Sequence, residues 1–356
     1  MSDKIKQCRE QIDRIDDELL KLFNQRAALA QQIGHVKGEG AVLRPEREAQ
    51  VLQRMKQSNR GPLPDEAVAQ LYTEIMSQCR ALEAPITVAY LGPSGTFSET
   101  AAIKRFGQAS QGEPCASIDD VFRAVESAAT NYGVVPVENS SEGAVGRTLD
   151  LLLQSPLKIC GEVMLTVHQC LLSHSDKLSS ITTVFSHPQS LGQCQGWLNA
   201  NLPHAKRVPV ASNAEAAAVL AAERDSTSAA IAGRMAAEKY GVPVLAENIE
   251  DDPRNTTRFL VIGNQDVAPS GRDKTSLVMS APNRPGAVHD LLLPLAKHGV
   301  SMTKLESRQA RSGLWEYVFF VDIEGHQYDV KVAAALAELK QAAAFVKILG
   351  SYPVAA

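Results

Sequence analysis

The first eighty residues carry apolar side chains at helical spacing. Between Ile5 and Ile33 an apolar residue returns every three or four positions, and no proline occurs before Pro45. This pattern predicts one long helix, a break at residues 38–40, a second helix from about Pro45 and a third over Val68–Leu82. A helix of about thirty residues is about 45 Å long. Two shorter helices cannot cover it, so an intertwined dimer is expected to bury its apolar stripe.

The hydrophobic pattern changes after residue 85, and strand and helix patterns then alternate up to about residue 268. Alternation of this kind favours an α/β sheet with crossover helices. The clearest patterns are strands over Thr87–Leu91, Tyr132–Val137, Thr183–Ser186, Ala229–Ala232 and Phe259–Gly263, helices over Thr148–Gln154, Leu191–Asn199 and Ala214–Glu223, and an apolar run over Val163–Leu172.

The C-terminal segment, residues 273–356, follows a polar linker. Its pattern reads strand, helix, strand, strand, helix, strand. That is the βαββαβ order of a ferredoxin-like α+β sandwich.

Composition narrows the class of protein. A chain of 356 residues is expected to form two or three domains, and its hydrophobic content of 44% is that of a globular protein. A net charge of −4 provides no positive field for nucleic acid or a membrane surface. The N-terminus has no apolar signal core, and the six cysteines form no CxxC pair, so we expect reduced thiols in the cytoplasm. The eight histidines show no ligand spacing, so neither a metal nor a redox cofactor is expected.

Polar residues gather directly before the apolar run Phe259–Gly263. The stretch Asp252–Arg258 combines hydroxyls, a carboxamide and guanidinium groups at the mouth of a buried strand. Such donors suit a small anionic ligand: Thr257 could hand a proton to a leaving hydroxyl while Arg258 neutralises a carboxylate. The alternative is a polar loop that only leads into a core strand.

Further polar clusters follow other predicted strands, at Gly92–Ser98, Pro136–Gly143, Ser186–Gln193 and Ser212–Glu215. Ligands bind at such strand ends in α/β folds. The Gly92–Ser98 turn also opens a helix, whose N–H groups favour an anion.

The Thr257-Arg258-Phe259 motif resembles the signature of prephenate dehydratases. The N-terminal segment resembles the helical chorismate mutases, and the C-terminal segment resembles an ACT domain. Together the chain is similar to the bifunctional chorismate mutase/prephenate dehydratases of phenylalanine biosynthesis. The resemblance implies an all-α mutase domain over 1–84, a two-lobed α/β dehydratase domain of periplasmic-binding-protein type over 85–268, and an ACT domain over 273–356.

The resemblance also implies an activity. Chorismate would be rearranged to prephenate, prephenate would be dehydrated and decarboxylated to phenylpyruvate, and phenylalanine would inhibit as an effector. The enzyme would be a homo-oligomer, at least a dimer, without nucleic-acid or membrane partners.

The mutase residues are expected to come from two chains. Arg26 and Lys37 are eleven residues apart and share a helix face, whereas Arg9 lies about 100° away, so one cavity would take Arg9 from the partner. By resemblance Arg9, Arg26 and Arg47 bind carboxylates, Glu48 binds a hydroxyl, and Lys37 and Glu83 act at the breaking ether oxygen. Glu83 must be protonated to donate there. Basic residues on such a helix are otherwise simply solvated.

The dehydratase residues are assigned by resemblance. Thr257 protonates or hydrogen-bonds the departing hydroxyl, and Arg258 is a helper. The alternative role of Glu138 is to cap the end of a strand. The residues expected to line the same cleft are Glu138, Asn139, Ser186 and Gln193, with Thr96 and Ser98 contacting a carboxylate.

Two motifs resemble the phenylalanine-binding motifs of ACT domains. Val288 stands where leucine is usual, and Gln309 where proline is usual, which affects loop shape and affinity. The alternative is a domain that only dimerises. The expected effector residues are Asn283, Gly286, Ala287 and Val288 in the first motif and Leu305, Glu306, Ser307 and Arg308 in the second.

Two rival functions stay open at this point. One is a non-catalytic sensor whose cleft and ACT domain read small molecules, and the other is an enzyme with one decayed site. A proton donor beside a ligand hydroxyl argues against the sensor.

Overall fold

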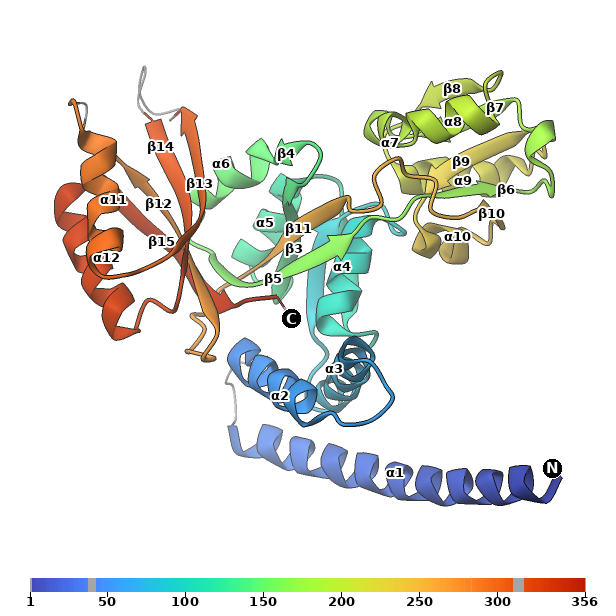
Figure 1. The fold of residues 1–356 in the computed structure, drawn as a ribbon, viewed down its shortest axis with the longest axis horizontal. Coiled ribbons are helices and arrows are strands. Elements are labelled where there is room, and N and C mark those ends of the chain that lie inside the picture. Colours follow the sequence, from blue (N-terminus) through green and yellow to red (C-terminus); the bar gives the residue numbers. More distant parts are fainter. Residues whose placement is uncertain (1, 38–42, 283, 310–316, 356) are drawn as a thin grey trace.

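A computed structural model describes residues 2–37, 43–282, 284–309 and 317–355. The predicted multidomain order is confirmed: helices, then a two-lobed α/β part, then a small α+β domain (Figure 1). Within the described ranges no helix is long and apolar enough to cross a membrane. The helices of the first part are α1 (Ser2–Lys37), α2 (Pro45–Ser58) and α3 (Asp65–Ala81).

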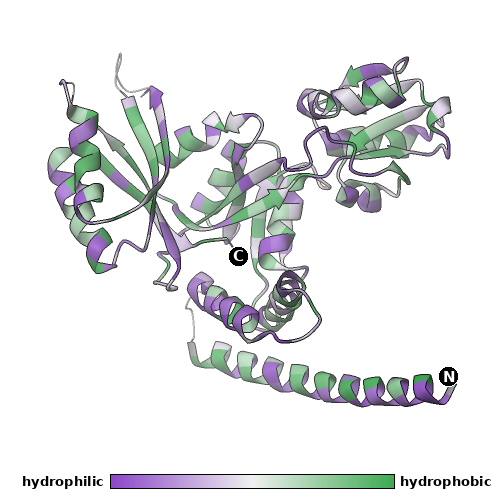
Figure 2. Cartoon of the chain, viewed as in Figure 1, coloured by the Kyte–Doolittle hydropathy of each residue, from purple (hydrophilic) through white to green (hydrophobic). Residues whose placement is uncertain are grey.

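The long helix α1 is the most exposed element. It touches α3 over part of its length, while α2 and α3 pack on each other. Apolar residues such as Ile12 and Ile15 stay more than half exposed. Figure 2 shows the hydrophobic positions along α1, and little of this chain covers them. Burial of apolar surface drives folding and association, so this exposed apolar stripe is a candidate contact surface.

The first lobe of the middle domain is a six-stranded mixed sheet in the order β2-β1-β3-β11-β5, with β4 beside β3. Its strands are mostly buried, because helices pack on both faces and the C-terminal domain covers part of one of them. Its elements are β1 (Thr87–Leu91), α4 (Phe97–Phe106), β2 (Gln111–Cys115), α5 (Ile118–Glu126), β3 (Tyr132–Asn139), β4 (Gly143–Ala144), α6 (Gly146–Gln154), β5 (Lys158–Thr166) and β11 (Thr256–Gly263).

The second lobe is a five-stranded sheet in the order β10-β6-β9-β7-β8. The chain enters this lobe after β5 and leaves it before β11, so two crossing segments join the lobes (Figure 1). Its elements are β6 (Cys170–Ser173), η1 (Leu178–Ser180), β7 (Thr183–Ser186), α7 (Pro188–Gln193), α8 (Gln195–Asn201), β8 (Lys206–Pro209), α9 (Asn213–Glu223), β9 (Ser228–Ala232), α10 (Arg234–Tyr240) and β10 (Val244–Ala246).

The C-terminal domain has the predicted βαββαβ order, with the sheet β13-β14-β12-β15. Helices α11 and α12 cover one sheet face, where Leu277 and Val321 pack with Leu336. Its elements are β12 (Asp273–Ser280), α11 (Ala287–Lys297), β13 (Met302–Gln309), β14 (Tyr317–Glu324), α12 (Val330–Ala342) and β15 (Phe345–Pro353).

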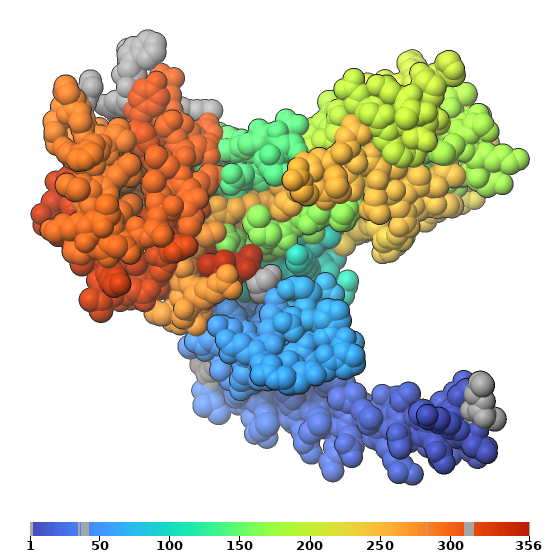
Figure 3. Space-filling view, viewed as in Figure 1, coloured from blue at the N-terminus to red at the C-terminus, as the bar shows by residue number. Residues whose placement is uncertain are grey.

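The other face of this sheet packs on the first lobe. Val278 and Phe320 belong to one apolar cluster with Val137, Leu152 and Leu260 of the middle domain. Figure 3 shows the C-terminal domain against the first lobe, with the second lobe projecting on the opposite side. The shared core fixes the C-terminal domain directly behind the strands β3 and β11.

Candidate active sites and effector site

A polar cavity of about 630 Å³ lies between the two lobes. The first lobe contributes the turn before α4, the end of β3 and the start of β11, and the second lobe contributes the starts of α7 and α9. The cavity therefore forms where the predicted polar clusters meet. Of the predicted dehydratase residues, Thr96, Ser98, Asn139, Gln193 and Thr257 line it.

Thr257 is held by an amide whose orientation is fixed. The Asn139 side-chain oxygen accepts from the backbone N–H groups of Ser141 and Glu142 at 3.0 and 3.2 Å. Its Nδ2 must then point the other way, and it donates to Thr257 Oγ1 at 2.8 Å and to Asn255 Oδ1 at 2.9 Å. Since Thr257 Oγ1 accepts this bond, the hydroxyl proton of Thr257 is available to a ligand in the cavity.

The turn before α4 supplies backbone donors. Gly95 has a φ of +91°, a left-handed conformation that favours glycine, and Thr96 caps the helix by accepting from the Glu99 N–H. The N–H groups of Phe97 and Ser98 lie in the first helical turn, where no intrahelical acceptor exists. A carboxylate at this end of the cavity would gain both donors and the helix dipole.

Glu99 and Tyr90 stiffen this turn. Glu99 accepts from the Gly95 N–H and from Lys239 of α10 in the other lobe. Burial alone would raise the pKa of Glu99, but the hydrogen bonds from Lys239 and Gly95 outweigh it and lower the pKa below its usual value. Burial raises the pKa of Tyr90 to about 12, so the phenol stays neutral beside Ser94 Oγ at 3.0 Å.

The second lobe adds amide and hydroxyl groups. Gln193 lines the cavity, and its Nε2 is buried without a hydrogen-bond partner among the described residues. Ser186 is fully buried behind the wall, with its Oγ 3.0 Å from Asn213 Oδ1. Asn213 in turn donates to Ser190 Oγ at 2.8 Å. Ser186 was expected to line the cleft, and the structure corrects this, because its side chain supports the wall from behind. Gln193 offers a ligand a donor that no described residue uses.

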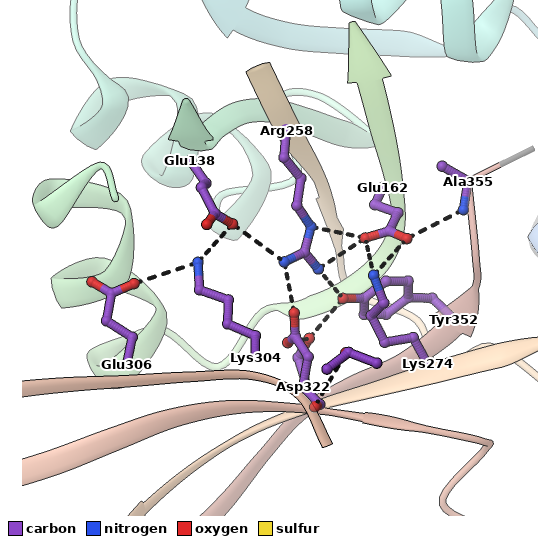
Figure 4. A network of polar contacts seen from close by, with 11 residues as sticks. Glu138, Glu162, Arg258, Lys274, Lys304, Glu306, Asp322, Tyr352 and Ala355 are labelled. Carbon is purple, nitrogen blue, oxygen red and sulfur yellow. Dashed lines mark hydrogen bonds and ion pairs between the residues drawn. The ribbon is translucent and has the colours of Figure 1, made fainter. Parts of the chain in front are cut away.

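Arg258 and Glu138 do not join the cavity, which corrects the expectation for both. Successive residues of a strand point to opposite faces, so the neighbours of Thr257 and Asn139 point toward the C-terminal domain (Figure 4). Arg258 is 8% exposed. Its guanidinium donates to Glu162 at 2.8 Å and to Asp322 at 2.6 Å.

The charge of Arg258 is committed to this network. Burial opposes its charge, but Tyr352, Asp322 and Glu162 together outweigh that and raise its pKa. Glu138 accepts instead from Lys304 Nζ at 2.8 Å. Neither side chain is available to a substrate carboxylate or hydroxyl in the cavity.

The sequence reading missed Asn255 and Gln169. Asn255 is 2% exposed and accepts the second N–H of the Asn139 amide. Asn255 belongs to the polar stretch before β11, and this stretch was the sequence feature that could have identified it. Gln169 lines the cavity from a segment that crosses between the lobes, and no motif marks it.

In the helical domain, two of the predicted mutase residues, Arg26 and Glu83, take part in contacts between α1 and the end of the α3 segment. Arg26 on α1 donates to Cys79 Sγ of α3 at 3.0 Å. Further along, Glu83 lies so close to α1 that a Cβ on Gly34 would come 2.6 Å from its Cγ. Lys37 ends α1, and its side chain lies outside the described part of the structure.

The other mutase residues lie apart in one chain. Arg9 is exposed, seventeen residues and about 25 Å along α1 from Arg26. Arg47 is exposed on α2, while Glu48 is buried and pairs with Arg80 and Arg105. Each carboxylate oxygen of Glu48 thereby has a guanidinium partner, so in this arrangement Glu48 is bound to Arg80 and Arg105.

The two effector motifs lie at one end of the C-terminal sheet. Ser280, just before the first motif, pairs with Val318, and Val318 pairs with Arg308 of the second motif. Gly286, at a φ of +79°, precedes α11, which opens with buried Ala287 and exposed Val288. Asn283 lies outside the described residues.

The second motif alternates between the two sheet faces. Leu305 pairs with Val321 and Ser307 with Phe319, on the side of the helices, and both motif residues are exposed. Glu306 and Arg308 point toward the middle domain, where Arg308 lies 3.2 Å from Asp150. Leu305 and Ser307 are therefore the residues of this strand that can meet a ligand at the start of α11.

Comparisons with known proteins match all three parts. Family models match as chorismate mutase type II over residues 8–84, prephenate dehydratase over 88–267 and ACT domain over 275–341. A bifunctional chorismate mutase/prephenate dehydratase of Neisseria gonorrhoeae is 56% identical and aligns with 98% of this chain and 96% of its own. The counterpart of Pseudomonas aeruginosa is 50% identical, with 99% and 98% covered.

Solved structures match the middle and C-terminal domains. A prephenate dehydratase of Arthrobacter aurescens in complex with L-Phe has a TM-score of 0.69 and 33% identity, over 75% of this chain and 90% of that one. A protein described as a quorum-quenching acylase, GqqA, has a TM-score of 0.70 and 30% identity, over 76% and 98%.

A polar cleft in a two-lobed α/β domain, fused to a helical domain and a ferredoxin-like domain, defines a multidomain enzyme with a C-terminal ACT module. The chain belongs to the family of bifunctional chorismate mutase/prephenate dehydratases.

Proposed function

We propose that this chain converts chorismate to prephenate in its helical domain and prephenate to phenylpyruvate in the interlobe cavity, with phenylalanine inhibiting through the ACT domain. The observation that carries the second reaction is the fixed Asn139 amide, which leaves the proton of Thr257 directed at a ligand. The enzyme works as a homodimer or a larger oligomer. Its six free thiols favour the reducing cytoplasm.

Prephenate is a dianion with a ring hydroxyl. The ring carboxylate leaves as carbon dioxide, its bonding electrons complete the aromatic ring, and the hydroxyl departs as water with a proton drawn finally from solvent. Thr257 donates its hydrogen bond to the departing hydroxyl, where negative charge develops. The turn at Thr96 and Ser98 and the free Nε2 of Gln193 orient the carboxylates. Holding these groups in one geometry lowers the barrier further.

The rearrangement of chorismate is pericyclic and requires no nucleophile. The site must hold a compact conformer and stabilise charge on the breaking ether oxygen. Arg26 and Glu83 come from one chain together with Lys37, and Arg9 comes from the partner. Arg47 contributes a further cation from α2. The exposed apolar stripe of α1 supports the dimer that this shared site needs.

The effector is proposed to bind between the start of α11 and the outer face of β13. Exposed apolar side chains of Val288 and Leu305 would contact a benzyl group. Backbone donors after Gly286 would contact the carboxylate.

The test is a pair of substitutions at Thr257. Thr257→Val removes the hydroxyl while keeping the shape, and we expect dehydratase kcat to fall about 10²- to 10⁴-fold. Thr257→Ser keeps the donor and should retain most of the rate. Mutase activity of both variants, measured on chorismate, reports that the helical domain is intact, and a wild-type melting midpoint reports that the dehydratase domain is folded. A Thr257→Val enzyme with near-normal kcat would remove Thr257 from the reaction.

A further inference from the structure

Asn139 and Thr257 line the proposed dehydratase cavity, and a second pair of side chains, Glu138 and Arg258, lies directly behind them. In the β3/β11 register Thr257 lies opposite Asn139, and Arg258 lies opposite Glu138. The first two side chains face the cavity, and the second two face the C-terminal domain. Each cavity residue is thus joined by one peptide bond to a residue whose side chain belongs to the ACT interface.

The ACT domain supplies partners to both rear residues. Arg258 donates to Asp322 of β14 at 2.6 Å and to the Tyr352 hydroxyl of β15 at 3.0 Å. Glu138 accepts from Lys304 of β13 at 2.8 Å. Figure 4 shows Arg258 beside Glu138, Glu162 and Asp322, and the Arg258–Glu138 contact is the longest of the three at 4.0 Å. Lys304 lies between Glu138 and Glu306, the latter at 3.4 Å.

These two links differ in how firmly they are held. Arg258 and Asp322 side chains are 9% and 10% exposed, and Asp322 also accepts from Ser276. The Lys304 and Glu138 side chains are 16% and 39% exposed. Arg258 therefore acts as a fixed anchor, because breaking a buried ion pair leaves an uncompensated charge. The more exposed Lys304–Glu138 pair can rearrange at a lower cost in free energy.

Lys304 also lies on the strand of the second effector motif. Alternation along β13 places Lys304 toward the dehydratase and its neighbour Leu305 on the outer face. A ligand that shifts or twists β13 at Leu305 must move Lys304, because one peptide joins them. The strand connects the proposed effector site to Glu138, and Glu138 connects to the amide that holds Thr257.

We propose that Lys304 is a positioning residue for the dehydratase and that its ion pair with Glu138 transmits effector occupancy to the Asn139–Thr257 pair. This inference rests on the proposed function, since it requires inhibition by phenylalanine. Binding of the effector displaces Lys304, Glu138 relaxes, and the end of β3 no longer holds Asn139 in register with Thr257.

The experiment separates binding of the effector from its effect. Lys304→Met keeps the aliphatic stem and removes the charge. Phenylalanine binding, measured by calorimetry on the full chain, should stay within about threefold of the wild type. In the wild type, phenylalanine at saturation should lower dehydratase kcat/KM by a factor on the order of five or more, and in Lys304→Met this factor should approach one. Lys304→Arg, which can rebuild the pair, should restore the inhibition.

Lys274 provides a matched control. It lies on β12, outside both effector motifs, and donates to Glu162 across the same interface at 2.9 Å. Lys274→Met therefore weakens the interface without touching β13, and it should keep full inhibition. Mutase activity verifies folding in every variant.

Two results would overturn the inference while leaving the proposed function intact. One is full inhibition of Lys304→Met by bound phenylalanine. The other is an equal loss of inhibition in Lys274→Met, which would point to general loosening of the interface. A wild-type enzyme that phenylalanine does not inhibit would instead refute the regulatory part of the proposed function, and the inference with it.

Discussion

Asn139 shows how a single side-chain orientation can decide a chemical role. An amide in solution can present either its oxygen or its nitrogen. Here two backbone N–H groups take the oxygen, and the nitrogen is forced toward Thr257. A threonine that already accepts one hydrogen bond keeps its proton for the substrate, which is the state that a departing hydroxyl requires.

Asn255 completes this arrangement and is predicted to be a positioning residue. Its Oδ1 accepts the second N–H of Asn139, while its own Nδ2 has no partner among the described residues. Asn255→Leu leaves a buried N–H of Asn139 unpaired, and we expect dehydratase kcat to fall about tenfold or more. Asn255→Asp keeps the accepting oxygen and should recover most of that loss. Steady-state kinetics on prephenate measure both, and equal rates in the two variants would contradict the role.

The sequence predicted the position of Thr257 and Asn139 better than the orientation of the residues next to them. Thr257 and Asn139 were expected in the cleft and line it, while Glu138 and Arg258 were expected there and face away. The reason is that both faces of β3 and β11 are largely buried, one by α4 and the other by α5, α6 and the ACT domain. Without a solvent-facing side, the sequence shows no polar alternation that would tell the two faces apart.

At the scale of elements, the sequence predicted the helices and the buried strands. It did not predict the edge strand β2 or the segment that crosses between the lobes. β2 has the pattern of an exposed edge and contains Pro114, so no apolar alternation marked it. The run Val163–Leu172 looked continuous but divides into β5 and β6. His168 and Gln169 lie in the break, where the chain passes between lobes.

The ion pair between helices α4 and α10 predicts how the stability of the protein depends on pH. Glu99 of α4 binds Lys239 of α10 at 2.7 Å, and its pKa is lowered in the folded state. A lowered pKa gives stability that is present above the unfolded value and is lost as pH falls through the folded value. Glu99→Gln should therefore lower the melting midpoint at neutral pH.

The protonation of Glu99 at low pH provides the control for this prediction. The gap in melting midpoint between the wild type and Glu99→Gln should begin to narrow as pH falls below 4.5, the ordinary pKa of this carboxyl, and should close once the pH lies below the lowered pKa of the folded state. Thermal unfolding of both proteins across pH measures this gap. A gap that is constant across pH would show that the charge of Glu99 contributes nothing.

At the scale of the whole molecule, we propose that the first reaction depends on a partner subunit. Arg9 and Arg26 are about 25 Å apart along α1, farther than one chorismate can span. Large apolar side chains of α1 are exposed in the single chain. Both facts follow if two copies share each mutase site.

Mixing two defective variants tests this sharing. Arg9→Ala and Arg26→Ala should each lose most mutase activity. After subunit exchange, half of the dimers are hybrids with one intact site of two, so roughly a quarter of wild-type mutase activity should return. Dehydratase activity serves as the internal control, because its cavity lies within one chain. Absence of any recovery after proven exchange would contradict a shared site.

The most direct test of the account is to supply chorismate to the purified enzyme and follow every product over time. The wild type should consume chorismate, pass through prephenate and accumulate phenylpyruvate, whereas Thr257→Val should consume chorismate normally and stop at prephenate. Unchanged chorismate, or phenylpyruvate formed by Thr257→Val at the wild-type rate, would contradict the account.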